Sequence, residues 1–163
     1  MVNEIGFEEL WDGRISQPLI HMSTAVLWSM RSTCQRLRVG AVLAKGGRTI
    51  STGYNGAPSG LPHCNDSNCK NRPQCKRTVH AEMNAILFAA RYGISTEGAE
   101  LYTTHSPCID CAKAIINAGI RAVYYLNEYR SQEGIELLKS AGVKVYRLVI
   151  NENGGEQKCH NEE

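Results

Sequence analysis

The stretch ELYTTHSPCIDCAKAIINAGIRAVYYL, which runs from Glu100 to Leu126, decides the fold of this chain. Its pattern predicts a strand at 100–104, a helix from about Cys108 to Ala118 and a second strand at 122–126. Two strands joined through a single helix favour parallel neighbours in one sheet. The chain is therefore expected to fold as an α/β protein.

The segments on either side continue this pattern. Apolar residues at helical spacing behind Pro18 predict a helix over about 18–32. Strand-like runs at 39–44 and 49–54 flank a Lys-Gly-Gly-Arg turn, as in an antiparallel hairpin. We expect a mixed five-stranded sheet with helices on both faces, in three αβα layers. The remaining elements are a helix that begins near His80, a helix near 132–140 and a strand at 144–149.

Composition indicates one globular domain. The 163 residues are 42% hydrophobic and 21% charged, which fits a single domain over residues 1–150 and a disordered polar tail at 151–163. A net charge of only +2 argues against a nucleic-acid-binding surface. The N-terminus lacks the features of a signal peptide, and no apolar run approaches the ~18 residues of a membrane span. We therefore expect a cytoplasmic protein without membrane contacts.

The cysteines point to a metal. In a reducing compartment, closely paired cysteines are better interpreted as metal ligands or catalytic thiols than as disulfides. Cys108 and Cys111 in SPCIDC lie three residues apart in the first turn of a helix, so both sulfurs can face one zinc ion. His80, at the start of the preceding helix, is the candidate third ligand, and the fourth position stays open for water. Glu82 would then stand beside that water and carry protons.

Each half of this pattern also has an ordinary interpretation. A lone CxxC is typical of redox-active thiols as well, and a glutamate near a helix start is favoured by the helix dipole alone. The two motifs in this order, each at the beginning of a helix, favour a catalytic zinc site.

The motifs HAE (80–82) and PCIDC (107–111) resemble the H-x-E…P-C-x-x-C signature of the zinc-dependent cytidine deaminase superfamily. A narrower resemblance, to deoxycytidylate deaminases, covers roughly residues 20–150. It implies a cytidine-deaminase-like fold and the zinc-dependent hydrolysis of dCMP to dUMP and ammonia, which feeds thymidylate synthesis. It also implies a homo-oligomer, with a hexamer favoured, activated by dCTP and inhibited by dTTP. The segments that show this resemblance are RSTCQRLRVGAV (31–42), STGYNGAPSG (51–60), HAEMNAILFAAR (80–91) and SPCIDCAKAIINAGI (106–120).

Substrate and effector residues follow from this resemblance and from charge. A 5′-phosphate needs cations, and Arg36 and Arg38 stand directly before a strand, on the same side of it. Both could instead be solvated surface charges. Asn55 could equally be an ordinary turn asparagine, and His105 a satisfied loop histidine. The resemblance assigns a sugar contact to Asn55, a place near the phosphate and sugar to Tyr129, and effector binding to Gly53, Gly56, Phe88 and Arg91. We also expect Ala81, His105, Ser106 and Arg130 to bind the substrate. Phe88 could instead belong to the core, with Arg91 a charge at a helix end.

The loop between Asn55 and His80 is cysteine-rich and too polar to form a core of its own. The resemblance suggests a second, structural zinc held by Cys34, Cys64, Cys69 and Cys75. A rival arrangement joins His80 to the last three of these cysteines, and free thiols are a further alternative.

Other functions remain open at this point. A tRNA adenosine deaminase or a nucleoside deaminase would share the zinc motif, although a tRNA enzyme is expected to carry a stronger basic surface. A non-catalytic zinc-binding module would have no use for Glu82.

Overall fold

The computed structural model describes residues 2–6, 14–64, 75 and 77–149. These residues contain one six-stranded sheet in the order β1-β6-β5-β4-β2-β3. β2 pairs antiparallel with both β3 and β4, whereas β4, β5, β6 and β1 run parallel to one another. The strands are β1 (Asn3–Gly6), β2 (Gly40–Lys45), β3 (Arg48–Tyr54), β4 (Glu100–His105), β5 (Ala122–Asn127) and β6 (Lys144–Val149).

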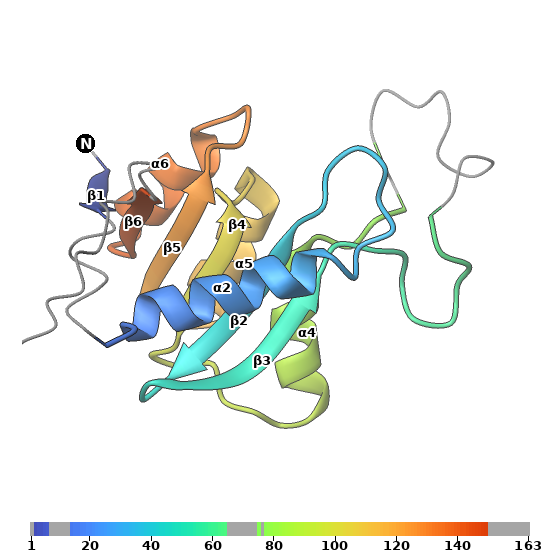
Figure 1. Cartoon of the computed structure of the whole chain (residues 1–163), viewed down its shortest axis with the longest axis horizontal. Helices are drawn as coiled ribbons and strands as arrows, with labels where there is room; N and C mark the ends of the chain where they lie inside the picture. Colours follow the sequence, from blue (N-terminus) through green and yellow to red (C-terminus); the bar gives the residue numbers. More distant parts are fainter. Residues whose placement is uncertain (1, 7–13, 65–74, 76, 150–163) are drawn as a thin grey trace, which may run out of the picture.

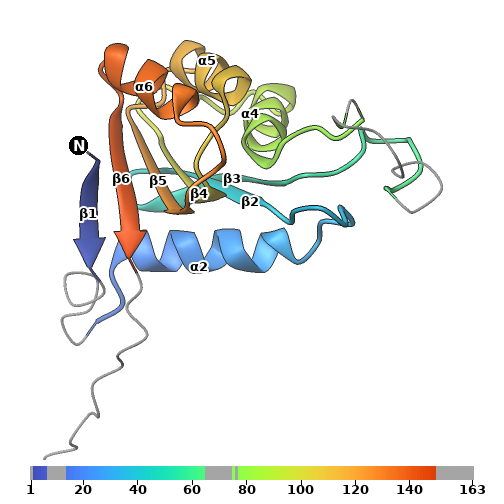
Figure 2. The ribbon, with the colours of Figure 1, turned by 90° about the horizontal axis from the view of Figure 1, so that it is seen from above.

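Helices cover both faces of the sheet. Figure 2 shows α2 alone on one face, while α4, α5 and α6 lie side by side on the other. None of the helices in the described part of the chain is long and apolar enough to cross a membrane. The helices are α2 (Gln17–Ser29), α4 (Ala81–Arg91), α5 (Ile109–Asn117) and α6 (Glu133–Ser140).

Local sequence signals fix the beginning of α2 and the β2–β3 turn. The Ser16 hydroxyl accepts a hydrogen bond from the Leu19 N–H, and a proline occupies the first turn of the helix. Gly46 and Gly47 have φ angles of 57° and 72°, the left-handed conformation that a two-residue hairpin turn requires. The antiparallel hairpin predicted from the sequence is therefore confirmed.

The mixed sheet with helices on both faces is confirmed, but the predicted number of five strands is wrong. The additional strand is β1, which pairs in parallel with β6 and places Asn3 opposite Tyr146. This strand has four residues and lies at the sheet edge, so it carries too little alternation to stand out in the sequence. Its partner is also the last strand among the described residues, a pairing that no local pattern reports.

The topology brings the starts of α4 and α5 to the same end of the sheet (Figure 1). A Cβ added to Gly53 in β3 would overlap the Ala81 carbonyl oxygen, so α4 packs directly on the β3 backbone. α5 follows β4 through a short connection after His105. The predicted meeting of the two helix starts is thus a consequence of the strand order.

Candidate active site

His80 and Cys108 occupy equivalent positions in two helices. Each is the residue immediately before the first helical turn, with extended backbone, of α4 and α5 respectively. Gly56 and Val79 hold His80 in place through two backbone hydrogen bonds, of 3.1 and 2.9 Å. Cys111 lies in the first turn of α5, three residues beyond Cys108, and is buried.

The three predicted ligands converge. His80 Nδ1 lies 3.4 Å from the sulfur of Cys108 and 3.4 Å from the sulfur of Cys111. Tetrahedral zinc with ordinary bond lengths would hold nitrogen and sulfur ligands ~3.6 Å apart, so this arrangement fits the ion. Across residues 2–6, 14–64, 75 and 77–149, no other three His, Cys, Asp or Glu side chains come close enough together to hold a metal.

Glu82 lies beside this group and is only 4% exposed. Burial raises the pKa of its carboxyl to about 7, against smaller lowering effects that include a hydrogen bond with Cys111 and the charge of His80. A carboxyl with a pKa near neutrality can take up and release a proton under working conditions, as a general acid and base must. Burying a glutamate without an ion pair costs free energy, so its buried position calls for an explanation.

The two thiols differ in their pKa values. A hydrogen bond from Cys111 lowers the pKa of Cys108 to about 4, while the same bond and burial raise the pKa of Cys111. The hydrogen bond with Cys108 raises the pKa of His80. These shifts favour a thiolate at Cys108, and a bound cation would replace the protons that these groups share.

Asn55 lies beside the segment that carries Arg38, and its amide binds the backbone of that segment. Oδ1 accepts a 2.8 Å hydrogen bond from the Val39 N–H, and Nδ2 donates a 2.8 Å bond to the Leu37 carbonyl. One N–H of Nδ2 and one lone pair of Oδ1 remain for a ligand. Asn55 can therefore support the turn and still have groups available to bind a substrate.

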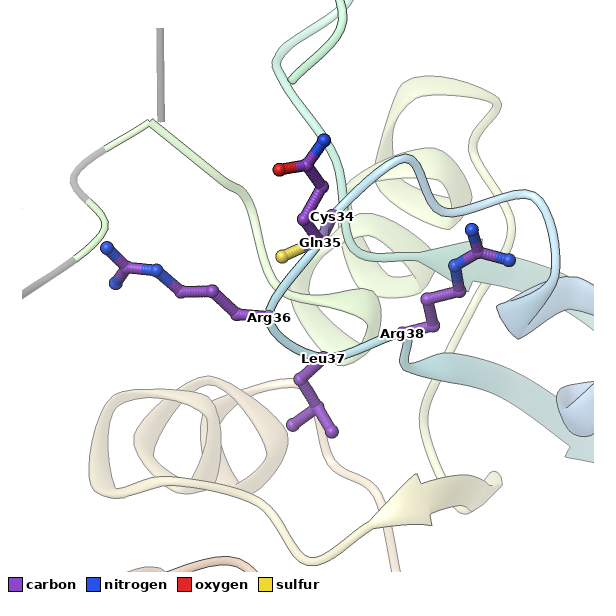
Figure 3. Close-up of a pocket in the computed structure, with 5 residues that line it drawn as sticks. All are labelled: Cys34, Gln35, Arg36, Leu37 and Arg38. Carbon is purple, nitrogen blue, oxygen red and sulfur yellow. The ribbon is translucent and has the colours of Figure 1, made fainter. Parts of the chain in front are cut away.

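Arg36 and Arg38 are placed differently from expectation. They lie in a turn that ends before β2, with Cys34, Gln35 and Leu37, and together these five residues line a cavity of about 460 Å³. Figure 3 shows the two guanidinium groups extending to opposite sides of the turn. The expectation that both stand on the same side of a strand is wrong, because the segment before β2 is not extended strand and the alternation of a strand does not apply to it.

On the other side of the site, Ser106 fixes the segment that follows β5. Its hydroxyl accepts a 2.7 Å hydrogen bond from the Tyr129 N–H, and its own N–H donates to the Asn127 carbonyl at 2.8 Å. The Arg130 guanidinium lies 5.5 Å from the centre of the Tyr129 ring, which is a cation–π distance. Tyr129 and Arg130 therefore form a pair.

His105 ends β4, with Nδ1 3.2 Å from the Thr104 hydroxyl. Burial lowers the pKa of this imidazole. Burial thus favours the neutral form of the ring, and one ring nitrogen has a hydrogen-bond partner within the protein.

Two of the four expected effector positions face solvent. Phe88 is 48% exposed, and its ring packs in a tilted arrangement against that of Tyr92, with 4.6 Å between the ring centres. The Arg91 guanidinium lies 5.9 Å from the centre of the same Tyr92 ring. Phe88 is therefore not a core residue. Gly53 and Gly56 are instead engaged with α4 and Val79.

The cysteines of the expected second zinc site are only partly described. Cys69 lies outside the described residues. The sulfurs of Cys64 and Cys75 lie 3.6 and 3.1 Å from the same Thr78 hydroxyl, and Cys34 is buried in the turn of residues 34–38, called the arginine turn below. Within the described ranges these cysteines do not form a three-ligand metal group, so a second zinc lacks support from the geometry.

The fold and this site define a zinc-binding deaminase domain. Residues 15–127 match the sequence model of the cytidine and deoxycytidylate deaminase zinc-binding region, and the chain belongs to that family.

Particular relatives sharpen this assignment. ComE operon protein 2 of Bacillus subtilis (strain 168) is 46% identical over 141 residues, covering 85% of this chain and 75% of that protein. Deoxycytidylate deaminase of Enterobacteria phage T4 is 37% identical over 168 residues, covering 78% and 87%. The crystal structure of dCMP deaminase from the cyanophage S-TIM5 in complex with dCMP and dUMP has a TM-score of 0.73 and 42% identity, covering 78% of this chain and 93% of that chain.

Proposed function

We propose that this protein hydrolyses dCMP to dUMP and ammonia. The observation that carries the proposal is the meeting of His80, Cys108 and Cys111 beside a buried carboxyl, Glu82, whose pKa is about 7. The phage T4 relative, a deoxycytidylate deaminase, and the cyanophage structure with dCMP and dUMP support this choice of substrate.

Three side chains would hold the zinc. A zinc ion bound by His80, Cys108 and Cys111 would lower the pKa of a water molecule toward ~7 and supply the nucleophile for C4 of the pyrimidine. Glu82 takes a proton from the attacking water and delivers it to N3 of the base. It then carries a second proton to the exocyclic amino group, which leaves as ammonia while the carbonyl of dUMP forms.

Binding of the nucleotide is assigned to residues around this group. The free N–H and lone pair of Asn55 would contact the sugar, and the Ala81 backbone and His105 would line the base pocket. Arg36 or Arg38 would attract the 5′-phosphate. Ser106, Tyr129 and Arg130 would close the opposite side, where the Ser106 hydroxyl already orders the Tyr129 backbone.

The wider biology belongs to the same proposal. We propose a cytoplasmic homo-oligomer, with a hexamer favoured, that feeds thymidylate synthesis, is activated by dCTP and inhibited by dTTP. Effector contacts would involve Gly53, Gly56, Phe88 and Arg91. Rate measurements on dCMP with each triphosphate, together with the mass in solution, test these statements. A single domain over residues 1–150 and a disordered tail at 151–163 also remain predictions.

The decisive experiment replaces Glu82 by glutamine. Glu82→Gln keeps the shape and removes the proton carrier, so ammonia release from dCMP should fall by about 10²–10⁴-fold or more, with zinc content and melting temperature unchanged. Asp110→Asn is the matched control, because Asp110 is an exposed carboxylate between the two cysteines, paired with Lys113. It should retain activity.

Parallel assays on deoxycytidine, dCTP and tRNA identify the substrate. Preferred turnover of one of these would replace the dCMP assignment with a nucleoside, triphosphate or tRNA deaminase. Full activity in Glu82→Gln would remove the proposed mechanism, and loss of folding would make Glu82 structural. Metal analysis of the same preparations counts the zinc ions: one per chain fits the His80 group, and two would support the additional cysteine site.

A further inference from the structure

The arginine turn between α2 and β2 has an unusual support. Residues 34–38 carry the cavity-lining side chains (Figure 3) and belong to no helix or strand. A turn of this kind holds its shape only if other groups bind its backbone. Two buried polar side chains, Ser32 and Asn55, do so.

Ser32 is 2% exposed and makes two hydrogen bonds. Its hydroxyl donates to the Asn55 carbonyl at 2.7 Å and accepts from the Cys34 N–H at 3.2 Å. It therefore ties the first residue of the turn to the segment after β3.

The Asn55 amide holds the far end of the same turn, through its bonds to the Leu37 carbonyl and the Val39 N–H. Ser32 connects the first end of the turn to Asn55, and the Asn55 amide binds the second end, so both ends are fixed to Asn55. Asn55 is itself only 6% exposed, so water does not compete strongly for these bonds.

This support extends to the metal ligands. Gly56, the residue after Asn55, pairs with Val79 through two backbone hydrogen bonds, and Val79 directly precedes His80. The Asn84 amide in α4 donates to the Tyr54 carbonyl at 2.7 Å. The arginine turn and the start of α4 are thus attached to the same three-residue segment, Tyr54 to Gly56.

We infer that Ser32 is a positioning residue: by fixing the turn to Asn55, it holds Arg36 and Arg38 at a set place relative to His80 and so determines affinity for the phosphate of the nucleotide. The inference rests on the proposed function, since it assigns the turn to the nucleotide phosphate. Arginine side chains have many rotamers, and a phosphate site gains affinity when the backbone that carries them is held before the ligand arrives. Ser32 itself touches no ligand.

The test compares equilibrium binding of dUMP and deoxyuridine by calorimetry, because neither is turned over and they differ only by the phosphate. The full chain should bind dUMP more tightly by about 10-fold or more, the contribution expected of charged hydrogen bonds. Ser32→Ala should lose most of that ratio while binding deoxyuridine as before. Ser32→Thr, which keeps the hydroxyl, should restore it.

A double-mutant cycle separates positioning from general damage. With Arg36 and Arg38 both changed to methionine, the ratio should already be lost, and adding Ser32→Ala should cost nothing further. The matched control is Thr96→Val, which removes a 2.7 Å hydrogen bond to the Ala118 carbonyl near the opposite end of α4. It should leave the ratio unchanged.

Each outcome decides the matter. The inference is wrong if Ser32→Ala keeps the ratio of dUMP affinity to deoxyuridine affinity. It is also wrong if Ser32→Ala lowers this ratio as much in the double methionine variant as in the full chain, or if the full chain does not prefer dUMP. If Ser32→Ala does not fold, Ser32→Cys replaces it, and its weaker donor should give a partial loss. Ammonia release from dCMP by the unmodified chain judges the proposed function separately: a chain that deaminates dCMP but keeps its ratio in Ser32→Ala refutes only the positioning role.

Discussion

Two histidines lie on opposite faces of the sheet: His21 is in α2, and His80 directly precedes α4. Nδ1 of His80 faces two sulfurs at 3.4 Å at the very start of α4. His21 is one of the buried residues of α2. Its Nδ1 lies 3.2 Å from the hydroxyl of Thr49 in β3, and its ring centre is 5.0 Å from that of Tyr102. Both rings are held by the protein, but only His80 meets a set of ligands.

This difference shows that the position of a histidine in the fold decides whether it can bind a metal, and that burial does not. His21 is 4% exposed, so by burial alone it would be the better candidate for a special role. It packs against paired strands, where neighbouring side chains fill the core. His80 stands at a helix start, where a second helix start converges with it at one end of the sheet. A metal site needs that convergence.

Replacing each histidine in turn gives the largest effect. His80→Ala removes a ligand and leaves two sulfurs, so zinc at the site and deamination should both be lost, with a fall of at least ~10³-fold in activity. His21→Phe keeps an aromatic ring against Tyr102 and should retain zinc and activity. Metal analysis and ammonia release measure both.

Circular dichroism of His80→Ala should show the native secondary structure. If His21→Phe lost zinc as His80→Ala does, the proposed separation of the two faces would be incorrect.

Gly134 tests how the ligand-bearing helix is held. A Cβ added to this α6 glycine would overlap the Pro107 carbonyl oxygen and lie 2.9 Å from the carbonyl carbon of Cys108. Alanine normally favours a helix by up to ~1 kcal/mol, but here overpacking against fixed backbone should dominate and destabilise by about 1–3 kcal/mol. Zinc affinity should fall as well, because the Cys108 backbone must move.

The matched control is Gly6→Ala, because a Cβ there meets nothing within 4 Å. Urea unfolding should place it within about 0.5 kcal/mol of the parent. A stabilised Gly134→Ala would mean that α6 yields and that the start of α5 is not clamped.

The same contrast explains what the sequence could predict. His80, Glu82, Cys108 and Cys111 belong to short motifs at helix starts, and each motif fixes its own geometry, so only the strand order was needed to bring them together. β1 was missed because its pairing with β6 joins the two ends of the described chain.

The arginine turn illustrates the limit of local patterns. The direction of Arg36 and Arg38 depends on bonds from Ser32 and Asn55, and Asn55 lies 16 to 18 positions away from the groups that its amide holds. Ser32 carries no sequence signal of its own, since a serine after a helix is common. Local rules cannot report contacts of this range.

The smallest predicted effect is a change in the pH dependence of stability, and it comes from His21 on the α2 face of the sheet. Burial lowers the pKa of His21, against a smaller raising effect of Glu100. In the unfolded chain this imidazole takes up a proton near pH 6.5, whereas the folded protein keeps it neutral to lower pH, so the unfolded state binds more protons in that window. The contribution of neutral His21 is therefore complete above pH 6.5 and is lost as the pH falls, by at most ~1.4 kcal/mol per pH unit.

Between pH 7.5 and 5.5 the zinc-loaded parent should lose roughly 2–4 °C more in melting temperature than His21→Phe, since about 1 kcal/mol corresponds to such a shift in a chain of this size. The zinc site is the same in both proteins, so its own pH dependence cancels in the difference. Nε2 of His21 is buried without a hydrogen-bond partner among the described residues, so protonation there finds no acceptor. Parallel melting curves for the two proteins across this range measure this difference, and an equal loss of melting temperature in both would show that burial of His21 does not disfavour its charged form.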